Sequence, residues 1–287
     1  MKGLILAGGS GTRLYPITRA VSKQLLPVYD KPMIFYPLSV LMLAGIQEIL
    51  IISTPEDLPN FQKLLGDGKD IGLQLSYAVQ PSPDGLAQAF IIGEKFIGKD
   101  NVSLILGDNF FFGQSLTKIF KNNINLKSGA KIFVHPVKNP QSYGVATLKG
   151  NKVLNLIEKP KKIKSNYAVT GLYFFDNKVV EYTKKLKPSK RNELEIIDLL
   201  NIYKKKNKLK SEFIGRGASW LDAGNIKDFY DASNFVETIE NRQGLKIACL
   251  EEIALKNKWI NKVDIKKSIN FYGNCEYSKY LKSLINA

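Results

Sequence analysis

Short apolar runs alternate with longer segments of helical spacing along the first part of the chain. The runs end in glycine or polar turns, which is typical of buried strands, and they cover residues 2–7, 48–53, 73–79 and 102–106. Between them the spacing predicts helices over residues 32–44, 55–65 and 86–96. Pro32 suits the first turn of the first helix, and Gly45 suits its end. Strands that alternate with helices predict an α/β fold with a mostly parallel central sheet flanked by helices.

The second part of the chain has shorter connections between its apolar runs. Strands are predicted at residues 131–137, 144–148, 153–158, 169–175, 212–214 and 219–221, and helices at residues 194–206 and 226–240. Residues 243–287 are expected to form a helical extension. No change in composition marks a boundary within residues 1–242, so one continuous sheet with an elaborated second lobe is expected, followed by a helical C-terminal region.

A glycine-rich turn follows the first predicted strand directly, with the sequence GGSGTR at residues 8–13. Glycine lets the backbone come close to a ligand, free N–H groups in such a turn can surround an anion, and Arg13 adds a forked cation that suits phosphate oxygens. The turn is not a dinucleotide fingerprint, because Leu14 stands where a further glycine is needed, and no Gly-Lys-Ser/Thr follows as in a P-loop. The turn therefore predicts a nucleotide polyphosphate site, and an ordinary strand-to-helix turn is the alternative.

Further polar residues stand at the carboxyl ends of predicted strands, where ligands bind in parallel sheets. A turn with the sequence QPSPDG follows the third strand, Asp108 follows the fourth, and Asp222 follows a short strand in the second part. Two carboxylates in one crevice would suit Mg²⁺, which takes one or two carboxylates together with phosphate oxygens. Each aspartate alone could equally form a turn or cap a helix. Lys23 and Lys159 could neutralise phosphate charge, or lie on the surface as ordinary lysines.

Composition narrows the classes of function. The net charge of +16 would suit nucleic acid, but only five of the 42 basic residues are arginine, so solvated lysine-rich faces explain the charge more simply and no nucleic-acid partner is expected. His135 is the single histidine, which excludes multi-histidine metal sites, and Cys249 and Cys275 are expected to be reduced thiols without a catalytic role. No apolar run is long enough to span a membrane and no secretory signal is recognisable, so a cytoplasmic protein without a membrane partner is expected.

A set of motifs in order along residues 1 to about 259 resembles those of the sugar-1-phosphate nucleotidylyltransferases. The motifs are GGSGTRLYP (8–16), SKQLLPVYDKPM (22–33), QPSPDGLAQA (80–89), LGDN (106–109), YGV (143–145), EKP (158–160), NYAVTGLYFFD (166–176) and WLDAG (220–224). Each motif alone is weak, and together in register they are specific. Ala223 stands where the family has threonine, and residues 110–114 depart from the family near its regulatory site, which concerns effector control more than catalysis.

The resemblance implies a Rossmann-like nucleotidyltransferase fold and a Mg²⁺-dependent reaction. In it α-D-glucose 1-phosphate attacks dTTP and gives dTDP-glucose and pyrophosphate, the first step of dTDP-rhamnose synthesis. A related enzyme that uses UTP or another sugar 1-phosphate, and a non-catalytic sugar-nucleotide-binding protein, are the alternatives. Residues 1–242 would form the catalytic domain, with its nucleotide part at about 1–110 and its sugar-phosphate part at about 111–242. Family members are typically homotetramers that the end product dTDP-rhamnose inhibits at an intersubunit site.

The resemblance also implies roles for single residues of this chain. The nucleotide would be bound by Gly8, Gly9, Ser10, Gly11, Thr12, Arg13, Lys23, Gln80 and Gly85. The sugar phosphate would be bound by Asn109, Tyr143, Gly144, Glu158, Lys159, Val169 and Arg191. Asp108 and Asp222 would hold Mg²⁺. The catalytic residues would be Arg13, Lys23, Asp108, Lys159 and Asp222.

Overall fold

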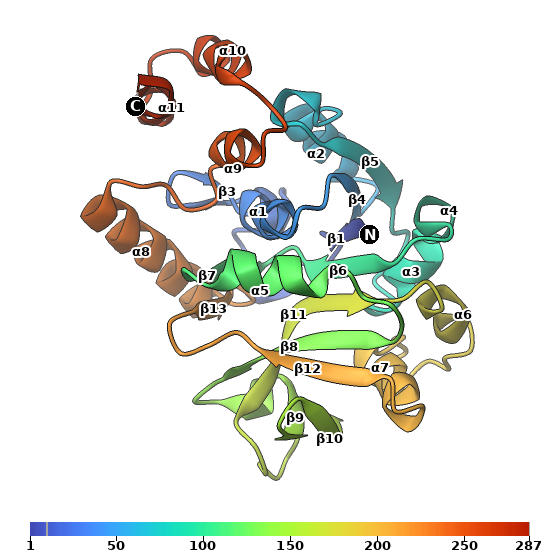
Figure 1. The fold of residues 1–287 in the computed structure, drawn as a ribbon. Helices are drawn as coiled ribbons and strands as arrows, with labels where there is room; N and C mark the ends of the chain where they lie inside the picture. Colours follow the sequence, from blue (N-terminus) through green and yellow to red (C-terminus); the bar gives the residue numbers. More distant parts are fainter. Residues whose placement is uncertain (10, 287) are drawn as a thin grey trace.

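A single sheet of nine strands runs through the computed structural model, which describes residues 1–9 and 11–286 (Figure 1). The strand order is β5-β4-β1-β6-β11-β8-β12-β10-β9. The first four strands in this order run parallel to one another, and they are β1 (Lys2–Leu6), β4 (Glu48–Ser53), β5 (Gln74–Val79) and β6 (Val102–Leu106). Because β1, β4 and β6 are buried along nearly their whole length, their uninterrupted apolar runs predicted them well.

Strand β11 joins the second lobe to the same sheet, because it pairs antiparallel with β6 on one side and with β8 on the other. The strands of this lobe are β8 (Ala130–Pro136), β9 (Gly144–Lys149), β10 (Lys152–Glu158), β11 (Tyr167–Phe175) and β12 (Leu209–Phe213). The predicted continuous sheet is therefore confirmed. In this lobe β8 and β12 are parallel, while β9, β10 and β11 pair antiparallel, as short connections require.

Helix α1 (Phe35–Ala44) lies at the centre of the first lobe and is buried along almost all of its length. It ends at Gly45, whose φ of 89° is the left-handed conformation expected of a helix-ending glycine. The prediction that Pro32 starts this helix is wrong. Pro32 instead pairs in a small antiparallel ribbon of β2 (Pro27–Val28) and β3 (Lys31–Pro32), and the helix begins after this ribbon.

The helix expected over residues 86–96 is divided at Gly93 into α3 (Gln88–Ile92) and α4 (Glu94–Ile97). Gly93 packs closely on β1, because a Cβ there would lie 3.2 Å from the side chain of Leu4. The remaining helices of the two lobes are α2 (Leu58–Leu65), α5 (Leu116–Asn123), α6 (Val179–Thr183), α7 (Ile196–Lys205) and α8 (Ile226–Gln243).

A two-stranded ribbon crosses between the lobes. It consists of β7 (Asn109–Phe112) and β13 (Ser219–Asp222), which pair antiparallel with Asp222 opposite Asn109. The sequence predicted β13 but not β7, because the apolar residues of β7 follow the LGDN turn without a break and show no alternation. The ribbon brings the two predicted metal-binding aspartates to one place.

The C-terminal extension is helical, as predicted, and lies at the opposite end of the molecule from the β9–β10 turn (Figure 1). Its helices are α9 (Leu250–Lys256), α10 (Lys262–Tyr272) and α11 (Glu276–Asn286). The buried carboxylate of Glu251 joins them, because it accepts hydrogen bonds from the hydroxyls of Tyr277 at 2.6 Å and Tyr272 at 2.9 Å. Both cysteines are free thiols, and burial raises the pKa of the Cys249 thiol to about 12.

A buried ion network ties the β2–β3 ribbon to α8 and to the segment that follows it. Glu240 of α8 is only 6% exposed, and its two oxygens lie 2.9 Å from the ammonium of Lys31 and 3.1 Å from that of Lys246. Asp30 also contacts both lysines. Because Glu240 also accepts a hydrogen bond from the backbone of Ile247, the network fixes the path of the chain toward the C-terminal helices.

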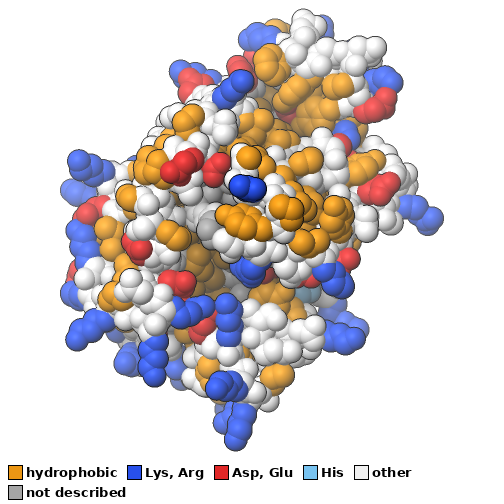
Figure 2. Space-filling model, turned by 180° about the vertical axis from the view of Figure 1, so that it is seen from behind, with side chains coloured by type: hydrophobic (Ala, Val, Ile, Leu, Met, Phe, Trp, Pro, Cys, Tyr) orange, Lys and Arg blue, Asp and Glu red, His pale blue; other side chains and the backbone are white. Residues whose placement is uncertain are grey.

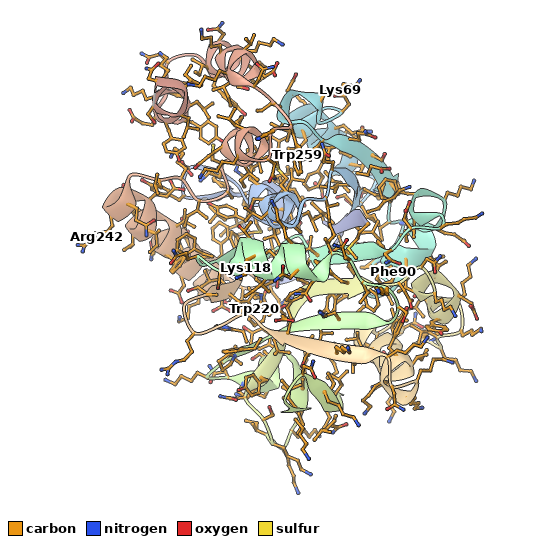
Figure 3. All side chains as sticks on the ribbon, viewed as in Figure 1. Lys69, Phe90, Lys118, Trp220, Arg242 and Trp259 are labelled. Atoms are coloured by element: carbon orange, nitrogen blue, oxygen red, sulfur yellow. The ribbon has the colours of Figure 1, made fainter. Side chains whose placement is uncertain are left out.

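The surface carries the excess of lysine as scattered side chains. In Figure 2 the Lys and Arg side chains stand mostly around the outline of the molecule, and do not form one continuous band on this face. Figure 3 shows Lys69 and Arg242 projecting from the outside, whereas Phe90 is fully buried and packs edge-on against Phe175 of β11. Among the described residues, no helix has the length and apolar character needed to cross a bilayer.

Candidate active site

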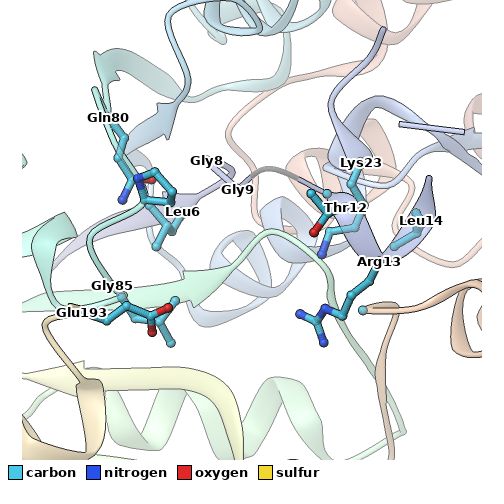
Figure 4. Close-up of a pocket in the computed structure, with 14 residues that line it drawn as sticks. Leu6, Gly8, Gly9, Thr12, Arg13, Leu14, Lys23, Gln80, Gly85 and Glu193 are labelled. Atoms are coloured by element: carbon cyan, nitrogen blue, oxygen red, sulfur yellow. The ribbon is translucent and has the colours of Figure 1, made fainter. Parts of the chain in front are cut away.

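A cavity of about 320 Å³ opens at the carboxyl end of β1. It is lined by Leu6, Gly8, Gly9, Gly11, Thr12, Arg13, Leu14, Lys23, Gln80, Pro83, Gly85, Leu86, Glu193 and Gly224. This set contains every predicted nucleotide-binding residue except Ser10, which lies outside the described residues. In Figure 4 the cations Arg13 and Lys23 stand at one end of the cavity, and Gln80 and Gly85 stand at the other.

The glycine-rich turn shapes the wall between these two ends. Gly11 has a φ of 59°, a left-handed conformation that favours glycine, and its carbonyl accepts a hydrogen bond from the hydroxyl of Thr18 at 2.7 Å. Gly8 lies against the side chain of Gln80, where a Cβ would come within 2.3 Å of Oε1. The glycines of the motif therefore meet two different needs, the first for space beside Gln80 and the last for its backbone conformation.

The two predicted metal-binding aspartates lie side by side at the cationic end. The β7–β13 pairing sets Asp222 opposite Asn109, and the backbone N–H of Ala223 donates to the carbonyl of Asp108 at 3.0 Å. The ammonium of Lys23 lies 2.5 Å from Oδ2 of Asp108. Both carboxylates are largely withdrawn from solvent, so the charge of Asp108 affects the protonation of Asp222.

The environment shifts the pKa values of the two aspartates in opposite directions. Burial, followed by the charge of Asp108, raises the pKa of Asp222 to about 7. Burial alone would also raise the pKa of Asp108, but the charge and hydrogen bond of Lys23 outweigh it and hold that pKa below its usual range. One carboxylate is thus already paired with a cation, while the other lacks a sufficient counter-charge.

These two carboxylates fit a divalent cation bound together with phosphate. Mg²⁺ characteristically uses one or two carboxylates and completes its shell with waters and substrate phosphate oxygens. Within residues 1–9 and 11–286, no cluster of three or more histidine, cysteine or acidic side chains could hold a metal without such help. The donor set therefore suits Mg²⁺ delivered with a nucleotide.

Arg13 reaches toward the same acidic pair. A Cβ at Gly224 would lie 3.4 Å from Nη1 of Arg13 and 3.1 Å from Oδ1 of Asp222, so glycine leaves room for both groups there. Among the ion pairs of the described residues, none involves Arg13. Its guanidinium is free to bind an anion inside the cavity.

Four of the predicted sugar-phosphate residues lie together at the edge of the second lobe. Gly144 of β9 pairs with Glu158 of β10, and Nη2 of Arg191 lies 3.6 Å from Oε1 of Glu158. The ammonium of Lys159 lies 4.0 Å from the same oxygen. Arg191 is also held by a forked contact with Glu195 at 2.9 Å. Burial raises the pKa of Glu158 despite these cations, so its carboxylate is a poorly solvated hydrogen-bond acceptor.

The three other predicted sugar-phosphate residues link this edge to the aspartates. Tyr143 packs edge-on against Trp220 with ring centroids 5.1 Å apart, and burial together with nearby acids raises its pKa to about 12. Asn109 is 1% exposed, and its Oδ1 accepts from the Trp220 indole at 2.6 Å and from the backbone N–H of Gly171 at 2.9 Å. Val169 is buried in β11. Asn109 therefore also braces the ribbon that carries Asp222.

Glu193 lines the cavity and was not predicted. It follows no strand and belongs to no glycine turn, so the sequence offers no signal for it. The tertiary structure brings it in, because the backbone N–H of Leu194 donates to the carbonyl of Asp84 at 2.7 Å and its carbonyl accepts from Ala87 at 3.1 Å. A second cavity of about 320 Å³, lined in part by Arg19, lies behind the glycine turn.

Comparison with known proteins finds enzymes that are similar to this chain. The model of the nucleotidyl transferase family matches residues 2–239. The chain is similar to proteins named glucose-1-phosphate thymidylyltransferase from Neisseria gonorrhoeae (58% identical), Neisseria meningitidis (56%) and Mycobacterium tuberculosis (50%), in each case over 286 residues and 99% of both chains.

Two solved structures share the fold. A protein from Bacillus anthracis, described as a candidate glucose-1-phosphate thymidylyltransferase and solved with sucrose, is 41% identical with a TM-score of 0.76, over 82% of this chain and 94% of that one. A UDP-glucose pyrophosphorylase solved with UDP-glucose is 25% identical with a TM-score of 0.73, over 83% of this chain and 98% of that one. The mixed α/β nucleotidyltransferase fold expected from the motifs is thereby confirmed.

Proposed function

The chain belongs to the nucleotidyl transferase family, and on that premise we propose that it transfers a thymidylyl group from dTTP to α-D-glucose 1-phosphate. The products are dTDP-glucose and pyrophosphate. The observation that carries the proposal is the cavity itself, which has the cations Arg13 and Lys23 at one end and the buried amide of Gln80 at the other, with Lys23 paired to the carboxylate of Asp108. Identities of 50 to 58% to thymidylyltransferases along nearly the whole chain support the choice of substrates.

The polarity of the cavity orients the nucleotide. The triphosphate lies along Gly8, Gly9, Gly11 and Thr12, with Arg13 and Lys23 beside its outer phosphates, because backbone N–H groups and cations stabilise anionic oxygens. The base is assigned to the end of the cavity formed by Gln80 and Gly85, which in Figure 4 is the end opposite the two cations. This arrangement leaves the α-phosphate near the two aspartates and open toward the second lobe.

Asp108 and Asp222 would hold the divalent cation, which we propose to be Mg²⁺. When bound, the ion neutralises charge on the phosphate oxygens during the transfer. Lys23, which pairs with Asp108 in the free protein, contributes a further positive charge at the same end of the cavity. Arg13 stabilises the pyrophosphate as it leaves.

Glucose 1-phosphate lies at the edge formed by Gly144 and Glu158, with Lys159 and Arg191 near its phosphate. Its phosphate oxygen attacks the α-phosphorus of dTTP, a new P–O bond forms, and the bond to the β-phosphate bridging oxygen breaks. The electron pair of that bond leaves with pyrophosphate. The proposed groups are suited to positioning and charge stabilisation, which account for most of the catalysis in reactions of this kind.

The remaining predicted residues lie around Trp220 and on strand β11, next to the proposed sugar site. Asn109 and Tyr143 meet at Trp220, and Val169 lies on the neighbouring strand β11. We assign them to the walls of the sugar site, with Asn109 also bracing the aspartates.

A related reaction with UTP is the second candidate, because the fold match to a UDP-glucose pyrophosphorylase spans 83% of this chain. Thymine and uracil differ by one methyl group, which is worth about 1–3 kcal/mol in a pocket. The purified chain should be assayed for pyrophosphate release with Mg²⁺ and glucose 1-phosphate against dTTP, UTP and dCTP. Fastest turnover with dTTP is expected, faster turnover with UTP would favour the second candidate, and no turnover with any nucleotide would overturn the proposal.

The last part of the proposal concerns the oligomeric state of the protein and its inhibition by the end product. We propose a cytoplasmic homotetramer with an intersubunit site for the end product dTDP-rhamnose. Exposed apolar side chains on α8 and α10, among them Tyr230 at 54% and Phe271 at 85%, give surfaces that subunits could cover. Light scattering would measure the mass in solution, and a monomer at micromolar concentration would contradict the tetramer. Inhibition by dTDP-rhamnose would test the effector.

A further inference from the structure

A chain of three polar side chains leads from the surface turn of the QPSPDG motif to the buried end of the nucleotide cavity. Nε2 of Gln80 donates to Oε1 of Gln88 at 2.7 Å, and Nε2 of Gln88 donates to Oδ2 of Asp84 at 2.9 Å. The hydroxyl of Ser82 donates to the same Oδ2 at 2.5 Å. Gln80 is 3% exposed and lines the cavity, whereas Asp84 lies in the turn that rims it.

The chemistry of Asp84 determines which group donates and which accepts in each of these hydrogen bonds. An ionised carboxylate can only accept hydrogen bonds, so it must face the NH₂ group of Gln88. The amide of Gln88 then directs its oxygen toward Gln80. Gln80 must therefore donate a hydrogen bond to this oxygen from its own NH₂ group. The amide of Gln80 therefore cannot rotate by half a turn without placing its oxygen, a second acceptor, against Oε1 of Gln88.

The oxygen of the Gln80 amide takes no part in this series of hydrogen bonds. Oε1 of Gln80 is buried and has no hydrogen-bond partner among the described residues. A buried acceptor without a donor costs about 1–3 kcal/mol, so a ligand that supplies a donor at this place is favoured. Gly8 keeps this atom in position, because any larger residue would place a Cβ 2.3 Å from it.

We propose that Asp84 and Gln88 are positioning residues that select the nucleobase by fixing the amide of Gln80 with its acceptor against Gly8, at the wall of the cavity. This inference rests on the proposed function and deepens it. Thymine and uracil carry a ring N–H at N3, which donates to such an acceptor, and a carbonyl oxygen at O4, which can accept the second hydrogen of the Gln80 NH₂ group. Cytosine has an unprotonated N3 and an amino group in these two places, so both contacts would be mismatched.

The test measures nucleotide binding to the full chain by calorimetry, with Mg²⁺ and without a sugar phosphate. The probes are dTTP, dCTP and dTTP methylated at N3. The wild type is expected to bind dTTP about tenfold or more tightly than either of the other two, the difference that one or two mismatched hydrogen bonds give. Equal binding of dTTP and dCTP would overturn the inference while leaving a nucleotide-binding enzyme in place. No binding of any nucleotide would overturn the proposed function as well.

Variants separate positioning from a merely structural role of the turn. Asp84→Asn supplies a side chain that can either donate or accept, so both orientations of the Gln80 amide become available and the dTTP-to-dCTP affinity ratio should fall several-fold. Ser82→Ala is the matched control, because it removes a different contact to the same Oδ2 and leaves an acceptor there. Its ratio should stay as in the wild type.

A double variant provides the decisive arm. Combining Asp84→Asn with Gln88→Glu moves the residue that can only accept hydrogen bonds from position 84 to position 88. Gln80 must then again donate from its NH₂ group to the side chain at position 88. The affinity ratio should return toward that of the wild type. A role of Asp84 in holding the shape of the turn predicts no such return. An unchanged ratio in Asp84→Asn, or a double variant no more selective than Asp84→Asn, would overturn the inference.

Discussion

The ammonium of Lys23 lies 2.5 Å from Oδ2 of Asp108, one of the two carboxylates proposed to hold the metal ion. Removing this charge should make the acidic pair more attractive to a divalent cation, since the carboxylates lose their internal counter-ion. We expect Lys23→Met to bind Mn²⁺ several-fold more tightly than the wild type without nucleotide at pH 8.5, measured by electron paramagnetic resonance. The same variant should turn over at least tenfold more slowly, because the triphosphate loses a cation. Weaker Mn²⁺ binding by Lys23→Met would contradict this arrangement.

The raised pKa of Asp222 makes the metal-free protein less stable as pH rises. The folded protein keeps the Asp222 proton until about pH 7, whereas the ordinary value for the carboxyl is 3.8. Between these values the folded state binds more protons than the unfolded state, so the free energy of unfolding falls with increasing pH. The melting temperature of the wild type in EDTA should drop between pH 5 and pH 7.5. Asp222→Asn should show a flatter profile and a turnover lower by roughly 10²–10³, and parallel profiles would refute the assignment.

The closeness of Gly8 to Gln80 predicts that alanine at Gly8 weakens dTTP binding, whereas alanine at a second glycine, Gly217, does not. A Cβ at Gly8 would lie 2.3 Å from Oε1 of Gln80, so Gly8→Ala must displace that amide and should weaken dTTP binding by roughly tenfold, the effect of one lost buried hydrogen bond. Gly217→Ala is the matched control, because nothing lies within 4 Å of its Cβ position. Calorimetric titration of both variants checks the prediction, and equal affinities would show that the amide does not contact the nucleotide.

The cations at Glu158 should act on the sugar phosphate and not on the nucleotide. Lys159→Ala is expected to raise the KM for glucose 1-phosphate by roughly tenfold or more, because a charge-assisted hydrogen bond is lost. The KM for dTTP should change little. Lys161→Ala removes an exposed lysine two positions along and serves as the control. Steady-state kinetics with each substrate varied in turn would show this split, and an effect confined to dTTP would move Lys159 out of the sugar site.

The buried network at Glu240 should matter for stability more than for activity. Glu240→Ala leaves the ammonium of Lys31 buried beside Asp30 alone and is expected to cost about 3–5 kcal/mol. Glu237→Ala changes an exposed residue of the same helix and should stay within about 0.5 kcal/mol of the wild type. Urea unfolding followed by circular dichroism gives both values. Equal stabilities would mean that solvent reaches the network.

The sequence by itself determined the parallel core and most of the residues that line the main cavity. The apolar runs of β1, β4 and β6 are local signals, because a strand buried on both faces needs no partner to be recognised. The turn after β1 is also local, since left-handed backbone at Gly11 favours glycine. Every predicted nucleotide residue that the structure describes does line one cavity, because the carboxyl ends of adjacent parallel strands meet at one edge.

Only the tertiary structure decided how these residues act on one another. The register of β7 and β13 brings Asp222 beside Asp108, and this pairing joins segments more than a hundred positions apart, where hydrophobic periodicity carries no information about partners. The elevated pKa of Asp222, the entry of Glu193 into the cavity and the fixed amide of Gln80 all depend on burial and on neighbours from other segments. Burial and long-range contacts set these properties because electrostatic and hydrogen-bond energies depend on distance in space and not on distance along the chain.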